Sequence, residues 1–263
     1  MATLVMSAWR RLALSIGYLL NETGVRLIVA GREMVRHVDR SLVDEHSDRF
    51  VLGLPKLHRA VAGQIRSQRK EYRHYAYFQG FPYQSLGILG IYGERGTEER
   101  FDAYGLAGLL GPDDRVLDVG CNCGFMAVYS VFRTGGRADG IDINPYMIEI
   151  GRACAEYLNI GDRVRLHAGR FQDFQPTEKY TAVFSFATHW TDDRNYRVSL
   201  GEHLTRLHAL LEDDGLLVFE SHSADVGSEE FYAALEAARN LFSWNGRRLL
   251  ENGSRELYIM KKN

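Results

Sequence analysis

The chain has 263 residues, of which 45% are hydrophobic and 25% are charged, and its formal net charge is -2. This length suits one large domain or a domain with an extension, and the composition is that of an ordinary globular protein rather than a low-complexity chain. The nearly neutral charge excludes a global attraction for nucleic acid or an anionic membrane, so neither is an expected partner.

The three cysteines are too few for a disulfide framework and lack the paired spacing of a zinc site. We therefore expect a reducing, cytoplasmic location. The apolar run Leu12–Leu20 follows two arginines, which is the order found in an export signal. However, it is too short to span a bilayer, and apolar residues recur at helical spacing from Leu4 to Leu19. We expect a packing helix there and no transmembrane segment.

Three regions follow one another along the chain. Residues 1–71 mix apolar and charged residues at helical spacing, which predicts a helical N-terminal extension that caps a substrate site or forms a homodimer. Residues 72–110 are rich in aromatic residues and glycine, and we interpret them as a connector or lid. Residues 111–263 alternate between strand and helix patterns, which is typical of a parallel sheet with crossover helices.

The third region predicts a complete α/β domain. Strands are expected at Arg115–Val119, Ala138–Ile143, Val164–His167, Ala182–Phe186, Leu216–Ser221, Arg248–Leu250 and Glu256–Lys261. Helices are expected at Phe125–Phe132, Pro145–Leu158, Tyr196–Leu211 and Glu229–Asn240. The expected fold is a Rossmann-like, doubly wound, seven-stranded, mostly parallel sheet that ends in an antiparallel hairpin.

The segment 116–125, VLDVGCNCGF, predicts a buried strand that runs into a glycine-bearing turn and then a helix. Glycine lets a backbone approach a ligand and adopt positive φ, and Asn122 is the side chain that best tolerates this conformation after glycine. Asp142 ends the next strand, where a carboxylate can accept both hydroxyl hydrogens of a ribose. The turn can therefore wrap a bound molecule.

This turn resembles the acidic-x-Gly-x-Gly-x-Gly motif of class I S-adenosylmethionine-dependent methyltransferases, with Asn122 in place of the middle glycine. The segment 140–145, GIDINP, looks like their second motif, and 210–218, LLEDDGLLV, resembles the turn into their fifth strand. The resemblance covers about residues 111–261, and three motifs in order are more specific than any one of them. It implies S-adenosylmethionine as the cofactor.

The resemblance also implies which residues surround that cofactor. Asp118 and Gly120 would lie near its methionine end, and Asp142 would hold the ribose. Relatives carry Gly-Asp after the third strand, with the acid near the adenine amino group, whereas Arg170 stands at that position here. Phe171 either stacks on adenine or belongs to the core. The expected cofactor-binding residues are Asp118, Gly120, Cys121, Asn122, Gly124, Asp142, Ile143, Arg170, Phe171, Phe186 and Arg95.

A Rossmann-type nicotinamide enzyme is the alternative for this fold. Its Gly-x-Gly-x-x-Gly pattern is missing, and Asn122 stands where a glycine should approach the pyrophosphate. Asp118 would repel a pyrophosphate, whereas it suits the ammonium and sulfonium of S-adenosylmethionine. The sequence therefore favours the methyl donor.

Methyl transfer from a sulfonium requires alignment and desolvation, and a hydroxyl acceptor must also lose its proton. His189 comes just after the fourth expected strand. Glu220 and His222 lie two residues apart at the end of the fifth strand. Either histidine could be the general base, with Glu220 orienting it, or each could be a hydrogen-bonded structural residue. Together with Asp192 and Asp193 they could instead hold a divalent metal such as Mg²⁺, although no tight ligand spacing supports this.

The lead-in segment 83–101 is similar to that of methyltransferases that tailor bacterial glycans, including O-antigen chain-capping and methylmannose-polysaccharide enzymes, and also to a tRNA wobble-uridine branch. Its Arg95 and Arg100 could bind the cofactor carboxylate or pair with Glu98 and Glu99. We expect O-methylation of a sugar or oligosaccharide hydroxyl.

Three other functions compete with sugar methylation. An RNA-modifying enzyme is suggested by the six lysines and arginines within residues 56–73, which could instead form a solvated helix face. A natural-product O-methyltransferase and a non-catalytic cofactor-binding subunit are the others.

The fourth strand lacks the Asn-Pro-Pro-aromatic or Asp-Pro-Pro-aromatic sequence of amino-methylating DNA enzymes, which disfavours N-methylation of a nucleobase.

Overall fold

The computed structural model describes residues 40–71, 82–190, 198–250 and 253–263. The expected helix between Leu4 and Leu19 lies outside these ranges. The strands are β1 (Gln84–Ser85), β2 (Arg95–Gly96), β3 (Arg115–Val119), β4 (Arg137–Asp142), β5 (Val164–Ala168), β6 (Tyr180–Phe186), β7 (Leu211–Glu220), β8 (Phe242–Ser243), β9 (Arg248–Leu250) and β10 (Arg255–Lys262). The helices are α3 (Arg40–Glu71), α4 (Thr97–Ala103), α5 (Phe125–Thr134), α6 (Pro145–Tyr157), α7 (Leu200–Leu210) and α8 (Glu229–Ala237), with short 3₁₀ turns between them.

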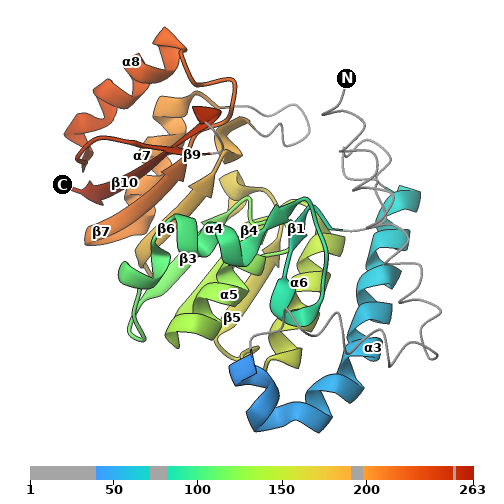
Figure 1. The fold of residues 1–263 in the computed structure, drawn as a ribbon. Helices are drawn as coiled ribbons and strands as arrows, with labels where there is room; N and C mark the ends of the chain where they lie inside the picture. The colour runs from blue at the N-terminus through green and yellow to red at the C-terminus, as the bar shows by residue number, and fades with distance from the viewer. Residues whose placement is uncertain (1–39, 72–81, 191–197, 251–252) are drawn as a thin grey trace.

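The described residues form an eight-stranded sheet in the order β5-β4-β3-β6-β7-β10-β8, and β9 also pairs with β10 (Figure 1). Neighbours from β5 through β7 are parallel, and β10 is antiparallel to β7. Chain order reverses between β3 and β6, which is the switch point where ligands bind in open α/β sheets. β1 and β2 form a separate parallel pair in the lead-in segment.

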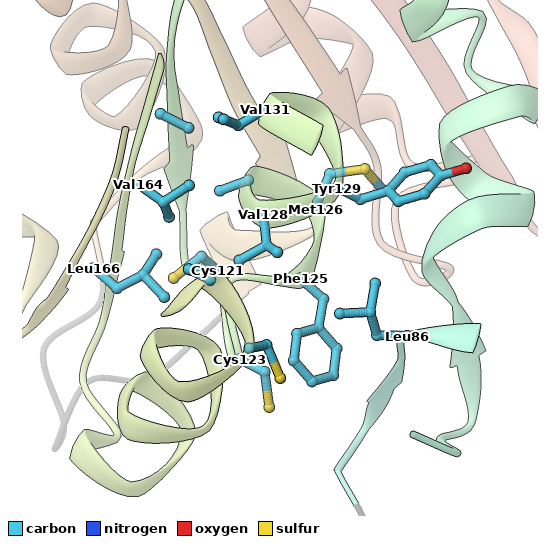
Figure 2. Close-up of a cluster of buried hydrophobic side chains, with 14 of the residues drawn as sticks. Leu86, Cys121, Cys123, Phe125, Met126, Val128, Tyr129, Val131, Val164 and Leu166 are labelled. Carbon is cyan, nitrogen blue, oxygen red and sulfur yellow. The ribbon is translucent and has the colours of Figure 1, made fainter. Parts of the chain in front are cut away.

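Helices cover both faces of the sheet. α5, α6, α4 and α3 share one apolar core on one face, and α7 and α8 pack on the other (Figure 1). Figure 2 shows part of the first core, where Cys121 and Cys123 lie among Phe125 and Val128. α3 contributes Leu57 and Val61 to this core and contacts α6, so the described part of the N-terminal region is packed into the domain.

The α/β fold confirms the sequence analysis, and all seven expected strands are present. β8 is an additional strand of two residues, too short to give an alternating pattern. α7 begins at Leu200 rather than Tyr196, because Ser199 and Glu202 form a reciprocal capping box. Within the described ranges, every helix is too short or too polar to cross a bilayer. Division of the chain at residues 71 and 110 stays a proposal.

Candidate active site

A pocket of about 410 Å³ opens at the carboxyl ends of the parallel strands. This volume is in the range of small-molecule sites. The pocket is lined by the turns after β3, β4, β5 and β6, by the segment after β7, and by the lead-in segment. It brings together ten of the residues expected from sequence, which are Arg95, Asp118, Gly120, Asn122, Asp142, Ile143, Phe171, Phe186, His189 and His222.

The turn after β3 has the left-handed conformations that its sequence predicts. Gly120, Asn122 and Gly124 have φ values of 64°, 54° and 66°. A β-carbon on Gly120 would collide with the methyl group of Thr188, so only glycine allows the turn after β6 to come this close. The two turns therefore meet in the pocket wall.

Asp142 holds this turn against the end of β4. Its two carboxylate oxygens accept the backbone N–H groups of Asn122 at 2.8 Å and Asn144 at 2.9 Å. Asn144 also caps α6, with its side chain accepting from Tyr146 and Met147. The carboxylate that was expected to hold a ribose is thus fixed in orientation at the pocket wall.

Asp118 supplies a buried acceptor at the pocket. Its Oδ2 is buried and has no hydrogen-bond partner among the described residues. Burial raises the pKa of Asp118 to about 7, against the opposing effect of the Arg100 guanidinium. Burying such a carboxyl group costs free energy unless a hydrogen-bond donor or a cation binds to it.

Two amide oxygens at the pocket are also buried acceptors without a donor. Oε1 of Gln84 and Oδ1 of Asn122 are buried without a hydrogen-bond partner in the part of the chain that the structure describes. S-adenosylmethionine carries an ammonium, two ribose hydroxyls and an adenine amino group, all of which are donors. The residues therefore fit this cofactor, because the pocket presents acceptors where the ligand presents donors.

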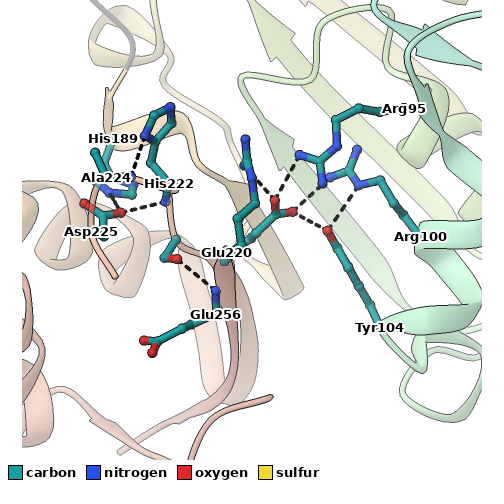
Figure 3. Close-up of polar contacts among 11 residues, drawn as sticks. Arg95, Arg100, Tyr104, His189, Glu220, His222, Ala224, Asp225 and Glu256 are labelled. Atoms are coloured by element: carbon teal, nitrogen blue, oxygen red, sulfur yellow. Dashed lines mark hydrogen bonds and ion pairs between the residues drawn. The ribbon is translucent and has the colours of Figure 1, made fainter. Parts of the chain in front are cut away.

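His189 lies at the pocket beside a carboxylate that the sequence analysis did not select. Its Nε2 is 2.8 Å from Oδ2 of Asp225, and both side chains are only 5% exposed (Figure 3). The ring packs against Phe219 and Phe231, at centroid distances of 5.2 and 6.2 Å, and these two rings also contact each other. When a neutral imidazole donates Nε2–H to a carboxylate, its lone pair is on Nδ1 and can accept a proton.

His222 is placed differently. Its Nδ1 accepts the backbone N–H of Ala224 at 3.1 Å, which commits that nitrogen's lone pair. Burial and the nearby Arg255 guanidinium lower the pKa of His222. His203 of α7 also lines the pocket, and burial together with His189 and Arg206 lowers its pKa to about 3. Its Nε2 lies 3.0 Å from Oγ of Ser185.

Glu220 lies on the opposite side of β7 from His189. Phe219 contacts His189, and because successive strand residues point to opposite faces, Glu220 points away from that ring. Its carboxylate contacts Arg95 at 3.0 Å, Arg100 at 3.2 Å and Arg255 at 2.7 Å, and it also accepts from Tyr104 (Figure 3). Asp225, and not Glu220, is therefore the carboxylate that meets a histidine, and Arg95 and Arg100 pair with Glu220 rather than with Glu98 and Glu99.

Three expected cofactor residues do not line the pocket. Cys121 is buried in the core, and burial raises the pKa of its thiol (Figure 2). Gly124 packs its α-carbon against Leu166, where a β-carbon would clash. Arg170 is exposed and pairs with Asp173. Asp192 and Asp193 lie outside the described residues, and the described ones contain no group of three or more His, Cys, Asp or Glu side chains placed to hold a metal.

Residues 116–215 match the sequence profile of a family described as a methyltransferase domain. In these residues the chain is similar to a methyltransferase domain. This similarity agrees with the acceptors at the pocket, which fit S-adenosylmethionine. The matched segment begins in β3 and includes the expected cofactor turn, Asp142 and His189.

The chain is also similar to a protein of Geobacillus sp. (strain WCH70) whose name describes it provisionally as a methyltransferase, with 30% identity over 130 residues. That alignment spans 48% of each chain, so this chain matches about half the length of this curated relative. Among solved structures, MccD protein is 14% identical, with a TM-score of 0.50 over 63% of this chain and 97% of that one. A methyltransferase from Geobacter sulfurreducens, solved with S-adenosyl-L-homocysteine, is 19% identical, with a TM-score of 0.49 over 59% and 68% of the two chains. At 14% identity, the likeness to MccD shows the fold alone.

Proposed function

We propose that this chain is an O-methyltransferase that methylates a hydroxyl group of a sugar or oligosaccharide, with His189 as the general base. The observation that carries the proposal is the 2.8 Å contact between His189 Nε2 and Asp225 Oδ2 at the pocket. A paired carboxylate fixes the tautomer and orientation of an imidazole and stabilises its protonated form. A hydroxyl acceptor needs this help because it must lose a proton as its oxygen is methylated.

In this proposal, some pocket residues bind the cofactor and others transfer the proton. Bound S-adenosylmethionine supplies a methyl group on a positively charged sulfur. Asp118 and Gln84 would accept hydrogen bonds from its ammonium, and Asp142 would accept from its ribose hydroxyls. His189 takes the acceptor's proton on Nδ1, while Asp225 compensates the charge of the imidazolium. Burial of both side chains excludes water from this pair.

A sugar is supported by the lead-in segment. This segment resembles that of glycan-tailoring enzymes, and its Tyr83, Gln84 and Arg95 line the same pocket as His189. Aromatic rings such as Tyr83 and Phe186 suit the C–H faces of sugars, and the polar side chains suit their hydroxyls. His222 and Arg255 also line this 410 Å³ pocket.

The test is methyl transfer from isotope-labelled S-adenosylmethionine to a panel of mono- and oligosaccharides, with products identified by mass spectrometry. His189→Ala should lower kcat at least about 100-fold, as loss of a general base does. S-adenosylhomocysteine affinity should stay within about twofold. Asp225→Asn should lower kcat and shift its pH profile, whereas the control His208→Ala changes a histidine of α7 that is outside the pocket.

Unchanged kcat in both His189→Ala and Asp225→Asn would refute the assigned base. Labelling of RNA but of no sugar would refute the acceptor class.

A further inference from the structure

Three arginines from distant parts of the chain surround the carboxylate of Glu220 at the pocket. Arg95 and Arg100 come from the lead-in segment and contact it at 3.0 and 3.2 Å (Figure 3). Arg255, the first residue of β10, contacts it at 2.7 Å. All three arginines line the pocket, and their side chains are only 11–13% exposed. Glu220 therefore balances only one of three permanent positive charges.

The two aspartates that line the described part of the pocket belong to other strands. Asp118 is on β3 and Asp142 ends β4, and β6 lies between these strands and β7. Asp142 and Glu220 end strands that are three steps apart in the sheet, which is roughly 14 Å at the usual strand spacing. The pKa of Asp118 is raised to about 7, so this carboxyl carries only part of a negative charge near neutral pH. Neither aspartate offsets the positive charge around Glu220 in full.

The cofactor does not supply the missing negative charge. S-adenosylmethionine brings an ammonium and a sulfonium but only one carboxylate, so its binding adds net positive charge to the pocket. Positive charge that is buried without a counter-charge costs free energy. An anion that binds beside the arginines would offset this cost once the cofactor is in place.

The donors on this side of the pocket suit an anion. A guanidinium presents its N–H groups as a fork that matches two oxygens of a carboxylate or a phosphate. His222 lines the same pocket, and its Nδ1 accepts the backbone N–H of Ala224. A neutral imidazole that accepts at Nδ1 carries its proton on Nε2, which makes that nitrogen a donor.

We propose that the acceptor carries an anionic group, a phosphate or a carboxylate, which binds Arg255 and Arg95 in the pocket. The inference rests on the proposed function, because it makes the sugar acceptor a sugar phosphate or an acidic sugar such as a uronic acid. His189 lines the same 410 Å³ pocket, and it follows β6, the neighbour of β7. One acceptor can therefore be held at Arg255 and lose a hydroxyl proton to His189.

The first experiment measures anion binding without assuming a particular sugar. Inorganic phosphate and, separately, acetate are titrated by calorimetry into the protein saturated with S-adenosylhomocysteine, at low ionic strength. At least one of these anions should bind, and Arg255→Gln should weaken its binding about fivefold or more. Arg255→Lys keeps the charge and should lose less. Both variants should bind S-adenosylhomocysteine within about twofold of wild type, because Arg95 and Arg100 still contact Glu220.

Arg137→Gln is the matched control. Arg137 is an exposed arginine at the amino end of β4, where it lines a different hollow. Its substitution should leave the affinity for both anions unchanged.

The second experiment measures methyl transfer to neutral and anionic forms of the same sugar. Glucose, mannose and galactose are each compared with their 6-phosphates and their uronic acids, so that the phosphate and carboxylate arms are separate. At least one anionic form should have a kcat/KM about tenfold or more above that of its neutral parent. Arg255→Gln should raise KM for that form much more than it lowers kcat, as loss of a binding contact does.

Anion binding that is unchanged in Arg255→Gln would overturn the inference, and so would methyl transfer to neutral sugars alone, which would leave the proposed function intact. If saturation with S-adenosylhomocysteine abolishes anion binding, the arginines bind the carboxylate of the cofactor and the inference is wrong. Anion binding that depends on Arg255, without methyl transfer to any sugar, would instead overturn the sugar acceptor and support the anionic group.

Discussion

Asp118 couples cofactor binding to protonation. Burial raises its pKa to about 7, so near pH 7 a large share of the ligand-free protein carries a neutral carboxyl. An ammonium beside Oδ2 favours the ionised form and lowers that pKa. We predict that binding of S-adenosylhomocysteine releases a proton near pH 7 and that the affinity rises from about pH 6 to about pH 8. Calorimetry in buffers of different ionisation enthalpy measures both quantities.

Asp118→Asn is the matched control because it is neutral at every pH. Its affinity should be lower and independent of pH in this range, and its binding should release no proton. The folded-state pKa lies above the ordinary value of 3.8, so the stabilising contribution of this group is complete below about pH 4 and is lost as pH rises through about 7. A wild-type affinity that does not change with pH would contradict the role of Asp118.

Packing between helices links α3 to the cofactor pocket. Gln68 of α3 is 1% exposed, and its Oε1 accepts from the side-chain amide of Asn144 at 3.2 Å. Asn144 in turn donates its backbone N–H to Asp142, the pocket carboxylate that we propose to hold the ribose. A helix from the N-terminal region thus supports the loop between β4 and α6.

We predict that Gln68→Leu weakens cofactor binding although Gln68 does not line the pocket. The substitution leaves the Asn144 amide buried without its acceptor, which costs about 1–3 kcal/mol of unfolding free energy. S-adenosylhomocysteine affinity should fall several-fold as Asp142 loses its fixed orientation. Gln68→Glu keeps an acceptor oxygen and serves as the control. An affinity of Gln68→Leu equal to that of wild type would show that α3 supports only the core.

The sequence predicts the elements whose patterns are local. β3 is a short, mainly apolar run next to glycine, β4 ends just before Asn-Pro, and Asn122 has the positive φ expected of it. The packing of α3 against α6 is not predictable, because helical spacing shows an apolar face but not its partner.

The polar contacts in the site are likewise not predictable where they join residues that are distant in the sequence. Asp225 is 36 residues from His189 and meets it only because β6 and β7 are neighbours in the sheet. Glu220 is one candidate from the sequence for orienting a histidine, because it ends β7 two residues before His222, but strand alternation turns it away from His189.

Glu220 connects segments that are far apart in the sequence. Its side chain is fully buried and contacts Arg95 and Arg100 of the lead-in segment, as well as Arg255 of β10. The carboxylate therefore fastens the lead-in segment to the sheet at the same edge as the cofactor pocket. Although burial raises the pKa of Glu220, Arg100 and Arg95 outweigh this effect and hold it below the ordinary value of 4.5.

We predict that Glu220→Gln lowers the free energy of unfolding by about 3–5 kcal/mol, because it leaves several buried guanidinium groups without their shared carboxylate. Glu178→Gln, which removes an exposed partner of Arg115, should cost about 1 kcal/mol or less. Since the folded-state pKa of Glu220 is lowered, its contribution is present above about pH 4.5 and is lost as pH falls through that pKa. The stability difference between wild type and Glu220→Gln should therefore shrink in acid, as urea denaturation at several pH values would measure. A difference that is small at pH 7, or that grows in acid, would show that the three arginines are held by other contacts and that the lead-in segment does not depend on Glu220.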